Sequence, residues 1–194
     1  MFRFFENLVD PYTEYPDEDR PPRDLWPFFM GYSQPFKKVF ALTAFMSILV
    51  AAIEVGLIYY MGRIVDLLGS DPKLMWAEHG TELIVVALFI VFLRPLFQAF
   101  DVALVNNAIL PNFGTLIRWR AHRQVLRQSV GWFENDFAGR IANRIMQTPP
   151  AAGEVVFQAF DAISFSLAYL IGAAILLTTS DPRLLLPLVI WFVV

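Results

Sequence analysis

The chain has 194 residues, of which 57% are hydrophobic and only 17% are charged, and its net charge is −3. A soluble domain of this length needs a more polar surface than that. The small net charge gives no reason to expect a nucleic-acid partner, and the absence of cysteine excludes disulfides and thiolate metal sites. Because the apolar residues come in long blocks, the composition indicates an integral membrane protein of α-helices.

Residues 1–23 are rich in proline and carry an acidic cluster at 17–19. Such a segment cannot build a core, and we expect it to be mobile. Residues 24–194 are expected to form a membrane domain, which opens with Leu-Trp-Pro-Phe-Phe-Met-Gly-Tyr at 25–32. Aromatic residues at this density favour the membrane–water interface. They predict a short helix lying flat on the membrane, with an aromatic-rich loop as the alternative.

Residues 39–61 are apolar except for Glu54 and a few hydroxyl groups. As a helix they reach roughly 35 Å, enough to cross a hydrocarbon core of about 30 Å. Further spans are expected at about 83–104, 163–179 and 184–194. The last of them reaches only about 16 Å, so we expect the chain to be truncated within an incomplete fourth span.

Lysine and arginine are distributed unevenly between the segments that join these spans. The 111–147 stretch holds six arginines and two acidic residues, whereas 62–82 holds two basic and four acidic residues. The positive-inside rule therefore places the N-terminus and 111–147 in the cytoplasm, with 62–82 outside.

The cytoplasmic excursion, residues 111–156, has the pattern of a helix rather than of a loop. Ile117, Ala121 and Val125 recur every four residues, which predicts an amphipathic helix that continues the second span. A helix over 106–131 would project on the order of 37 Å beyond the membrane. A basic stripe lies on another face of this helix, at Arg120, Arg123 and Arg127. We interpret this stripe as a face exposed to water, whose positive charges also keep the segment on the cytoplasmic side of the membrane.

The far tip of the excursion carries Trp132 and Phe133, with Gly139 expected to reverse the chain. Exposed aromatic side chains far from lipid need a protein partner to cover them. Beyond the tip, Pro149 and Pro150 should break or kink the returning helix.

Residues 131–144, Gly-Trp-Phe-Glu-Asn-Asp-Phe-Ala-Gly-Arg-Ile-Ala-Asn-Arg, resemble the first intracellular loop of ATP-binding cassette (ABC) exporters. In that family an aromatic pair, an acidic turn, a glycine and a later arginine surround a short coupling helix. Residues 25–28 resemble the flat elbow helix of the family, and 180–184 resemble its tight outer turn. The resemblance implies contacts with a nucleotide-binding domain through Trp132, Phe133, Glu134, Asn135, Asp136, Gly139 and Arg144.

The resemblance covers about residues 24–194 and implies an all-α, ABC exporter-type transmembrane domain with long helices extending into the cytoplasm. Such a domain forms the substrate path and couples to a cytoplasmic nucleotide-binding domain that binds ATP and Mg. Its further partners are the lipid membrane, a hydrophobic substrate and a second transmembrane half, in a homodimer or a heterodimer. The expected location is the bacterial inner (plasma) membrane, as a multi-pass protein.

This chain has no Gly-x-x-x-x-Gly-Lys-Ser/Thr loop, so it cannot hydrolyse ATP alone, and we expect no catalytic, cofactor or metal site in it. Three charges fall within the expected spans: Glu54, Arg94 and Asp101. They suit either helix–helix pairing or contact with substrate along the pathway. A different class of function is also open, a non-transporting membrane anchor or regulatory module that docks a cytoplasmic partner at the same aromatic tip.

Overall fold

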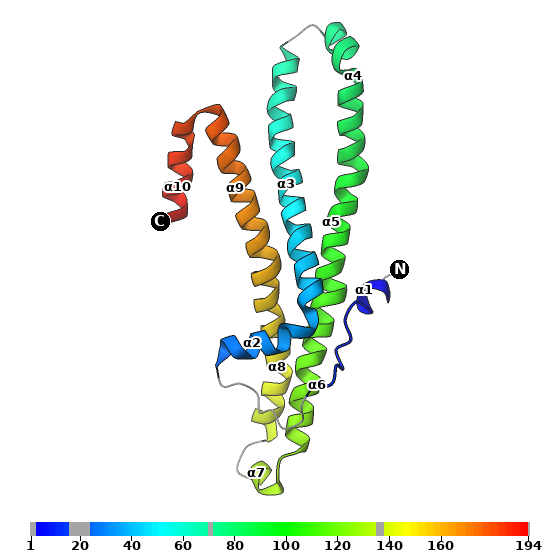
Figure 1. Ribbon diagram of the computed structural model, residues 1–194, viewed down its shortest axis with the longest axis vertical. Coiled ribbons are helices and arrows are strands. Elements are labelled where there is room, and N and C mark those ends of the chain that lie inside the picture. Colours follow the sequence, from blue (N-terminus) through cyan, green and yellow to red (C-terminus); the bar gives the residue numbers. More distant parts are fainter. Residues whose placement is uncertain (1–2, 16–23, 70–71, 135–137, 194) are drawn as a thin grey trace. The chain divides into compact units, whose positions relative to one another are not determined.

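The computed structural model describes residues 3–15, 24–69, 72–134 and 138–193, and the elements in these ranges are helical (Figure 1). The α-helices are α1 (Arg3–Glu6), α2 (Leu25–Ser33), α3 (Lys37–Leu68), α4 (Pro72–Leu88), α5 (Arg94–Ala103), α6 (Leu110–Leu126), α7 (Val130–Glu134), α8 (Ala138–Phe157), α9 (Ile163–Ser180) and α10 (Leu185–Val193). Two 3-10 turns, η1 (Gln34–Phe36) and η5 (Pro182–Leu184), and three π-helical segments, η2 (Phe89–Leu93), η3 (Leu104–Ile109) and η4 (Gln158–Ala162), join them. The predicted all-α fold class is confirmed.

Several of these elements follow one another without a break and form three long, apolar helices. They cover Leu25–Leu68, Met75–Leu126 and Ala138–Ser180, and each is long and apolar enough to cross a membrane. These helices contain the segments expected to span at 39–61, 83–104 and 163–179. A shorter apolar helix follows at Pro182–Trp191, where the fourth span is expected. The joining segment at 62–82, expected as a loop, is helical up to Leu68 and again from Pro72.

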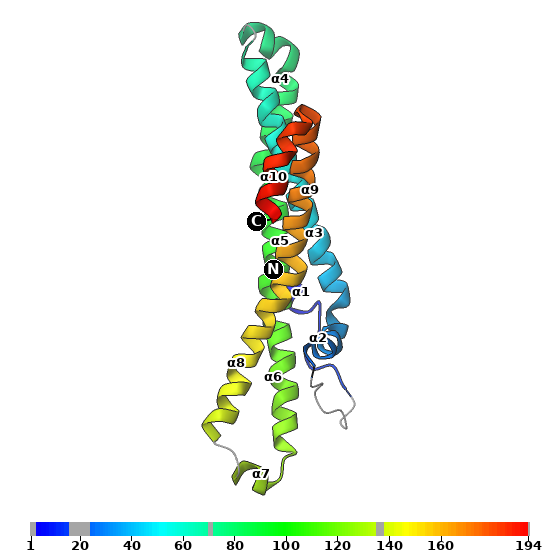
Figure 2. The same ribbon diagram turned by 90° about the vertical axis from the view of Figure 1, so that its left-hand side faces the viewer.

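Residues 1–43 and 102–161 form one compact unit, and residues 44–101 and 162–194 form another. In the first unit α6 packs along α8, and α7 lies at the tip where the two helices are joined (Figure 2). Phe36 and Phe113 are fully buried in the core of this unit. The ring of Phe40 stacks on that of Phe160, with centroids 4.4 Å apart. Aromatic packing therefore fixes the base of the hairpin formed by α6, α7 and α8.

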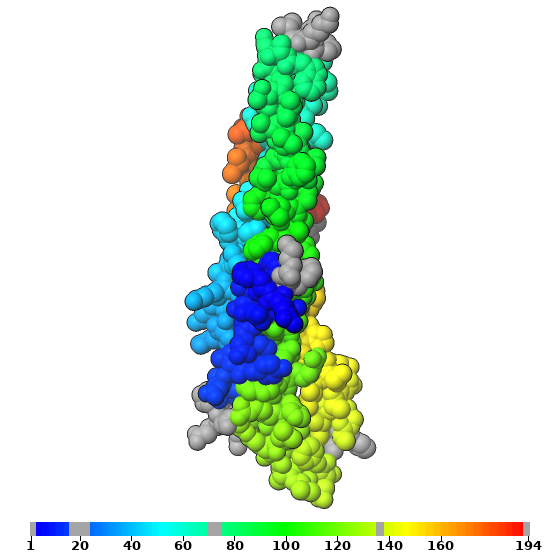
Figure 3. Space-filling view, turned by 90° about the vertical axis from the view of Figure 1, so that its right-hand side faces the viewer, coloured from blue at the N-terminus to red at the C-terminus, as the bar shows by residue number. Residues whose placement is uncertain are grey.

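The N-terminal segment contributes to this core, contrary to the expectation that it takes no part in one. Val9 is buried, and Phe5 and Leu8 pack against the same cluster. The Asn112 side chain donates a hydrogen bond to the Glu6 carbonyl oxygen over 2.9 Å, and Figure 3 shows the N-terminal residues in blue against the green helix. The apolar side chains at 4–9 can be buried against this core, and the proline-rich remainder of 1–23 has few such side chains. The described residues 3–15 thus lie on the hairpin.

The two prolines do not end the returning helix, so the expected break is wrong, whereas the alternative, a kink, stays a prediction. α8 continues through Pro149 and Pro150, although neither can donate the backbone hydrogen bond of an α-helix. Pro149 is buried, and a Cβ built on Gly114 of α6 would lie 3.8 Å from its Cβ. That distance is an ordinary van der Waals contact, so Pro149 packs against α6, and this packing helps to offset the lost hydrogen bonds.

In the second unit, α9 approaches α3 closely at Gly172. A Cβ placed on Gly172 would lie 2.7 Å from Cγ2 and 3.0 Å from Cγ1 of Val55. Small residues commonly permit such close approach between helices in membranes.

We expect Gly172→Ala to lower the free energy of unfolding by about 1–3 kcal/mol, the usual cost of overpacking a tight contact. Gly62→Ala is the matched control, because no atom lies within 4 Å of the added Cβ. Denaturant unfolding of both variants in detergent, followed by circular dichroism, measures the difference. Equal stability of the two variants would show that α3 and α9 do not pack at this point.

Candidate functional site

The tip of the hairpin is a short helix that presents two aromatic side chains. α6 ends at Leu126, and α7 begins after three residues with a hydrogen bond from the Trp132 N–H to the Ser129 carbonyl oxygen. The rings of Trp132 and Phe133 meet edge to face, with centroids 5.0 Å apart and planes at 90°. Their exposed fractions are 37% and 42%. The pair is thus ordered by its own contact and remains accessible.

The other residues expected at the tip are placed differently. Glu134 is the last residue of α7, and it is exposed. Gly139 lies in the first turn of α8 with no positive φ, so it does not reverse the chain as expected. Arg144 lies further along α8 and lines a pocket. The expectations for Asn135 and Asp136 lie outside the described residues.

The packing of α6 on α8 supports the tip mechanically. Leu116 and Ile117 of α6 are buried, as are Ala152 and Val156 of α8. The amphipathic helix predicted from the spacing of Ile117, Ala121 and Val125 is present, but it ends at Leu126 rather than near 131. Close-packed interiors transmit strain, so the apolar seam couples the two helices mechanically. The hairpin can therefore carry a displacement of its tip toward its base.

Two of the three charges expected in the spans form an ion pair. Arg94 donates from Nε over 2.9 Å and from Nη2 over 2.7 Å to Oε1 of Glu54. The pair joins α3 to α5, and it agrees with the helix–helix pairing that was one of the two interpretations. Asp101 lies near the end of α5 and is buried.

A π-helical segment precedes Arg94 and accommodates the proline that follows it. Pro95 cannot donate a hydrogen bond to the preceding turn. The Arg94 N–H donates to the Phe89 carbonyl oxygen, five residues earlier, at the end of η2. Such π-turns widen a helix and redirect the side chains that follow.

The basic stripe on α6 does not form a simple solvated face. The guanidinium of Arg120 lies 4.6 Å from the ring centroid of Tyr15 and 4.8 Å from that of Tyr32. Arg123 lies over the rings of Tyr15 and Trp119. Tyr32 belongs to α2, so its contact with Arg120 holds α2 against α6.

The contacts of these two arginines with aromatic rings were not predicted from the sequence. The regular spacing of the arginines shows a face of a helix, but it does not show which residues cover that face. Tyr15 is remote from Arg120 in the sequence and reaches it only because the N-terminal segment packs on α6.

The long apolar helices and the hairpin with an aromatic tip define a multi-pass α-helical membrane domain, and the chain is an integral membrane protein. The family described as "ABC transporter transmembrane region" matches residues 40–194. The chain belongs to this family, and it is a transporter membrane domain.

One curated relative is 30% identical over 195 residues, an "Uncharacterized ABC transporter ATP-binding protein" of Haemophilus influenzae (strain ATCC 51907 / DSM 11121 / KW20 / Rd). The match covers 100% of this chain and 31% of the relative, so the chain spans about a third of that protein's length. No solved structure matches the chain.

Proposed function

We propose that this chain lines the substrate path of an ATP-driven exporter and couples that path to a nucleotide-binding domain at α7. The observation that carries the proposal is the exposed, edge-to-face pair of Trp132 and Phe133 at the end of two packed helices. Large aromatic side chains at an exposed tip gain most by burial in a pocket of a partner. The Haemophilus influenzae relative is named an ABC transporter ATP-binding protein, which supports a partner of that kind.

In this proposal ATP and Mg are bound by the nucleotide-binding domain, and this chain supplies the mechanical connection. Movement of the partner displaces α7, and the seam between α6 and α8 carries the displacement toward the membrane. A second transmembrane half, identical or different, completes the path. A hydrophobic substrate suits walls built from Phe, Leu and Ala, as the composition suggests.

The proposal requires that the tip and the N-terminus face the cytoplasm, with the joining segment between α3 and α4 on the opposite side. We expect single cysteines at Ser129 and Glu78, both exposed positions, to react with an impermeant maleimide from opposite sides of the bacterial inner membrane. The described chain contains no cysteine of its own, which simplifies the experiment. Labelling of both positions from the same side would contradict the proposed orientation.

A further inference from the structure

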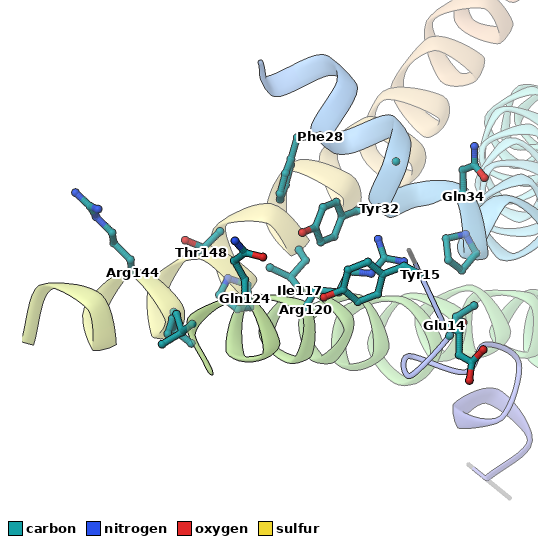
Figure 4. A pocket seen from close by; sticks show the side chains of 17 residues that line it. Glu14, Tyr15, Phe28, Tyr32, Gln34, Ile117, Arg120, Gln124, Arg144 and Thr148 are labelled. Carbon is teal, nitrogen blue, oxygen red and sulfur yellow. The ribbon is translucent and has the colours of Figure 1, made fainter. Parts of the chain in front are cut away.

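The first unit contains a pocket, lined by both apolar and polar side chains, that the coupling function does not use. It has a volume of about 890 Å³ and lies among α2, α6, α8 and the N-terminal segment. Its polar lining includes Tyr15, Tyr32, Arg120, Gln124, Arg144 and Thr148. Figure 4 shows Arg120 beside the two tyrosines, with Gln124 and Thr148 between them and Arg144.

Arg120 brings a positive charge to this pocket. In the described part of the chain no ion pair involves Arg120 or Arg144. The Nε atom of Arg120 is buried and has no hydrogen-bond partner there. Glu14 is the acidic residue among those lining the pocket, and Figure 4 shows it at the opposite end from Arg144. Arg120 is half-buried, and a partly buried charge without a counter-charge is costly, so an anion bound in the pocket would stabilise it.

The two tyrosines position this guanidinium for an anion. Tyr15 and Tyr32 contact Arg120 through their ring faces, at 4.6 and 4.8 Å. A cation–π contact occupies the faces of the guanidinium and leaves its in-plane N–H groups free to donate. Those groups match the spacing of two oxygens on a phosphate and bind it in a bidentate manner. Tyr32 also lines the pocket, and its hydroxyl group is a further donor.

The wall formed by α2 relates the pocket to the membrane surface. Leu25, Trp26 and Met30 of this helix are exposed, at 77%, 72% and 54%. Aromatic and apolar side chains on a short helix favour the lipid headgroup region. Basic pockets at that level on the cytoplasmic side bind the headgroups of anionic lipids. This step rests on the proposed orientation, whereas the charge and the pocket do not.

We propose that the pocket among α2, α6 and α8 is a binding site for a phosphate group, supplied by the headgroup of an anionic lipid with Arg120 as its principal ligand. The same chemistry would accept a soluble phosphate ester, so the test has to separate the two sources. A bound headgroup would hold α2 against the hairpin and make its position sensitive to the lipid composition.

The test measures binding to the complete protein in an uncharged detergent by native mass spectrometry and calorimetry. Short-chain phosphatidylglycerol is the lipid probe, a diacylglycerol of the same chain length is the phosphate-free control, and glycerol 3-phosphate is the soluble probe. We expect phosphatidylglycerol to bind, the diacylglycerol not to bind at this site, and glycerol 3-phosphate to bind at least about tenfold more weakly. Glycerol 3-phosphate binding as tightly as the lipid would overturn the assignment to a lipid.

Arg120→Gln should weaken binding of phosphatidylglycerol by about tenfold or more, because it removes the charge-assisted donors. Arg120→Lys should give an intermediate loss, because it keeps the charge without the planar fork. Arg118→Gln is the matched control, since Arg118 is exposed on the same helix and does not line the pocket. An unchanged melting temperature without lipid shows that a variant is folded. If Arg120→Gln does not fold, Arg144→Gln replaces it in the binding measurement.

Equal losses for Arg118→Gln and Arg120→Gln would overturn the site, because binding would then follow net charge alone. The acidic run at 17–19 lies outside the described residues and is close in sequence to Tyr15. Binding that appears only after Asp17, Glu18 and Asp19 are neutralised would therefore overturn the proposal as well. Failure of all lipid binding would leave the coupling role of α7 untouched, because that role does not depend on this pocket.

Discussion

Replacing Trp132 and Phe133 together by alanine is expected to abolish ATP-driven transport while the complete protein still hydrolyses ATP. Both side chains are exposed at the end of the hairpin, so their loss leaves no cavity in its core. Truncation of an aromatic anchor in a partner's pocket typically costs about 2 kcal/mol or more, which weakens the contact about 30-fold. Membrane insertion and substrate binding should remain nearly unchanged.

The measurement compares substrate-stimulated ATPase activity with transport in the same proteoliposomes. Met146→Ala is the matched control, because Met146 is an exposed apolar residue of α8 away from the tip. Its ratio of transport to ATP hydrolysis should equal that of the unmodified protein. Transport at the normal rate by the double variant would refute the coupling role of α7 and favour a membrane anchor that docks a cytoplasmic partner.

Removal of one member of the Glu54–Arg94 pair is expected to destabilise the second unit strongly. Glu54→Gln leaves Arg94 without the carboxylate that accepts two of its hydrogen bonds. An unpaired charge within a membrane span costs about 3 kcal/mol on insertion scales. The double variant Glu54→Gln/Arg94→Gln should lose much less stability than the sum of the two single changes, since neither charge remains.

Unfolding of the four proteins in mixed micelles gives the coupling energy directly. Glu82→Gln is the control, because its pair with Arg63, at 2.7 Å, joins helix ends outside the expected spans. An exposed pair of that kind contributes about 1 kcal/mol or less. If Glu54→Gln instead alters the Kd for substrate at unchanged stability, the residue belongs to the substrate path and not to helix pairing.

The apolar blocks were sufficient to predict the fold class and the long helices. A segment such as 39–61 has few alternatives to an α-helix, because its backbone hydrogen bonds must be satisfied within lipid. Local rules were less reliable where tertiary contacts opposed them. Proline disfavours the interior of a helix, but the rule does not anticipate that Pro149 is buried against α6 near Gly114.

The aromatic pair of the candidate site was predicted from the sequence, whereas the partners of the charged residues were not. An aromatic pair between two polar segments is visible in the sequence, and α7 carries it at the tip. The partner of a charge is not visible, because Glu54 and Arg94 lie forty positions apart and meet only in the folded chain, where their side chains join α3 to α5. The role of Arg120 depends in turn on where Tyr15 folds, and composition alone predicts that the segment around Tyr15 has no fixed place.

Photo-crosslinking from Phe133 tests the coupling of α7 to a nucleotide-binding domain most directly. Benzoyl-phenylalanine replaces Phe133 with an aromatic residue, and it would be incorporated in the complete protein in membrane vesicles. We predict that irradiation joins α7 to a peptide of the nucleotide-binding domain, and that ATP with Mg changes the yield. Products that contain only lipid, or only peptides of the transmembrane region, would contradict the proposed coupling.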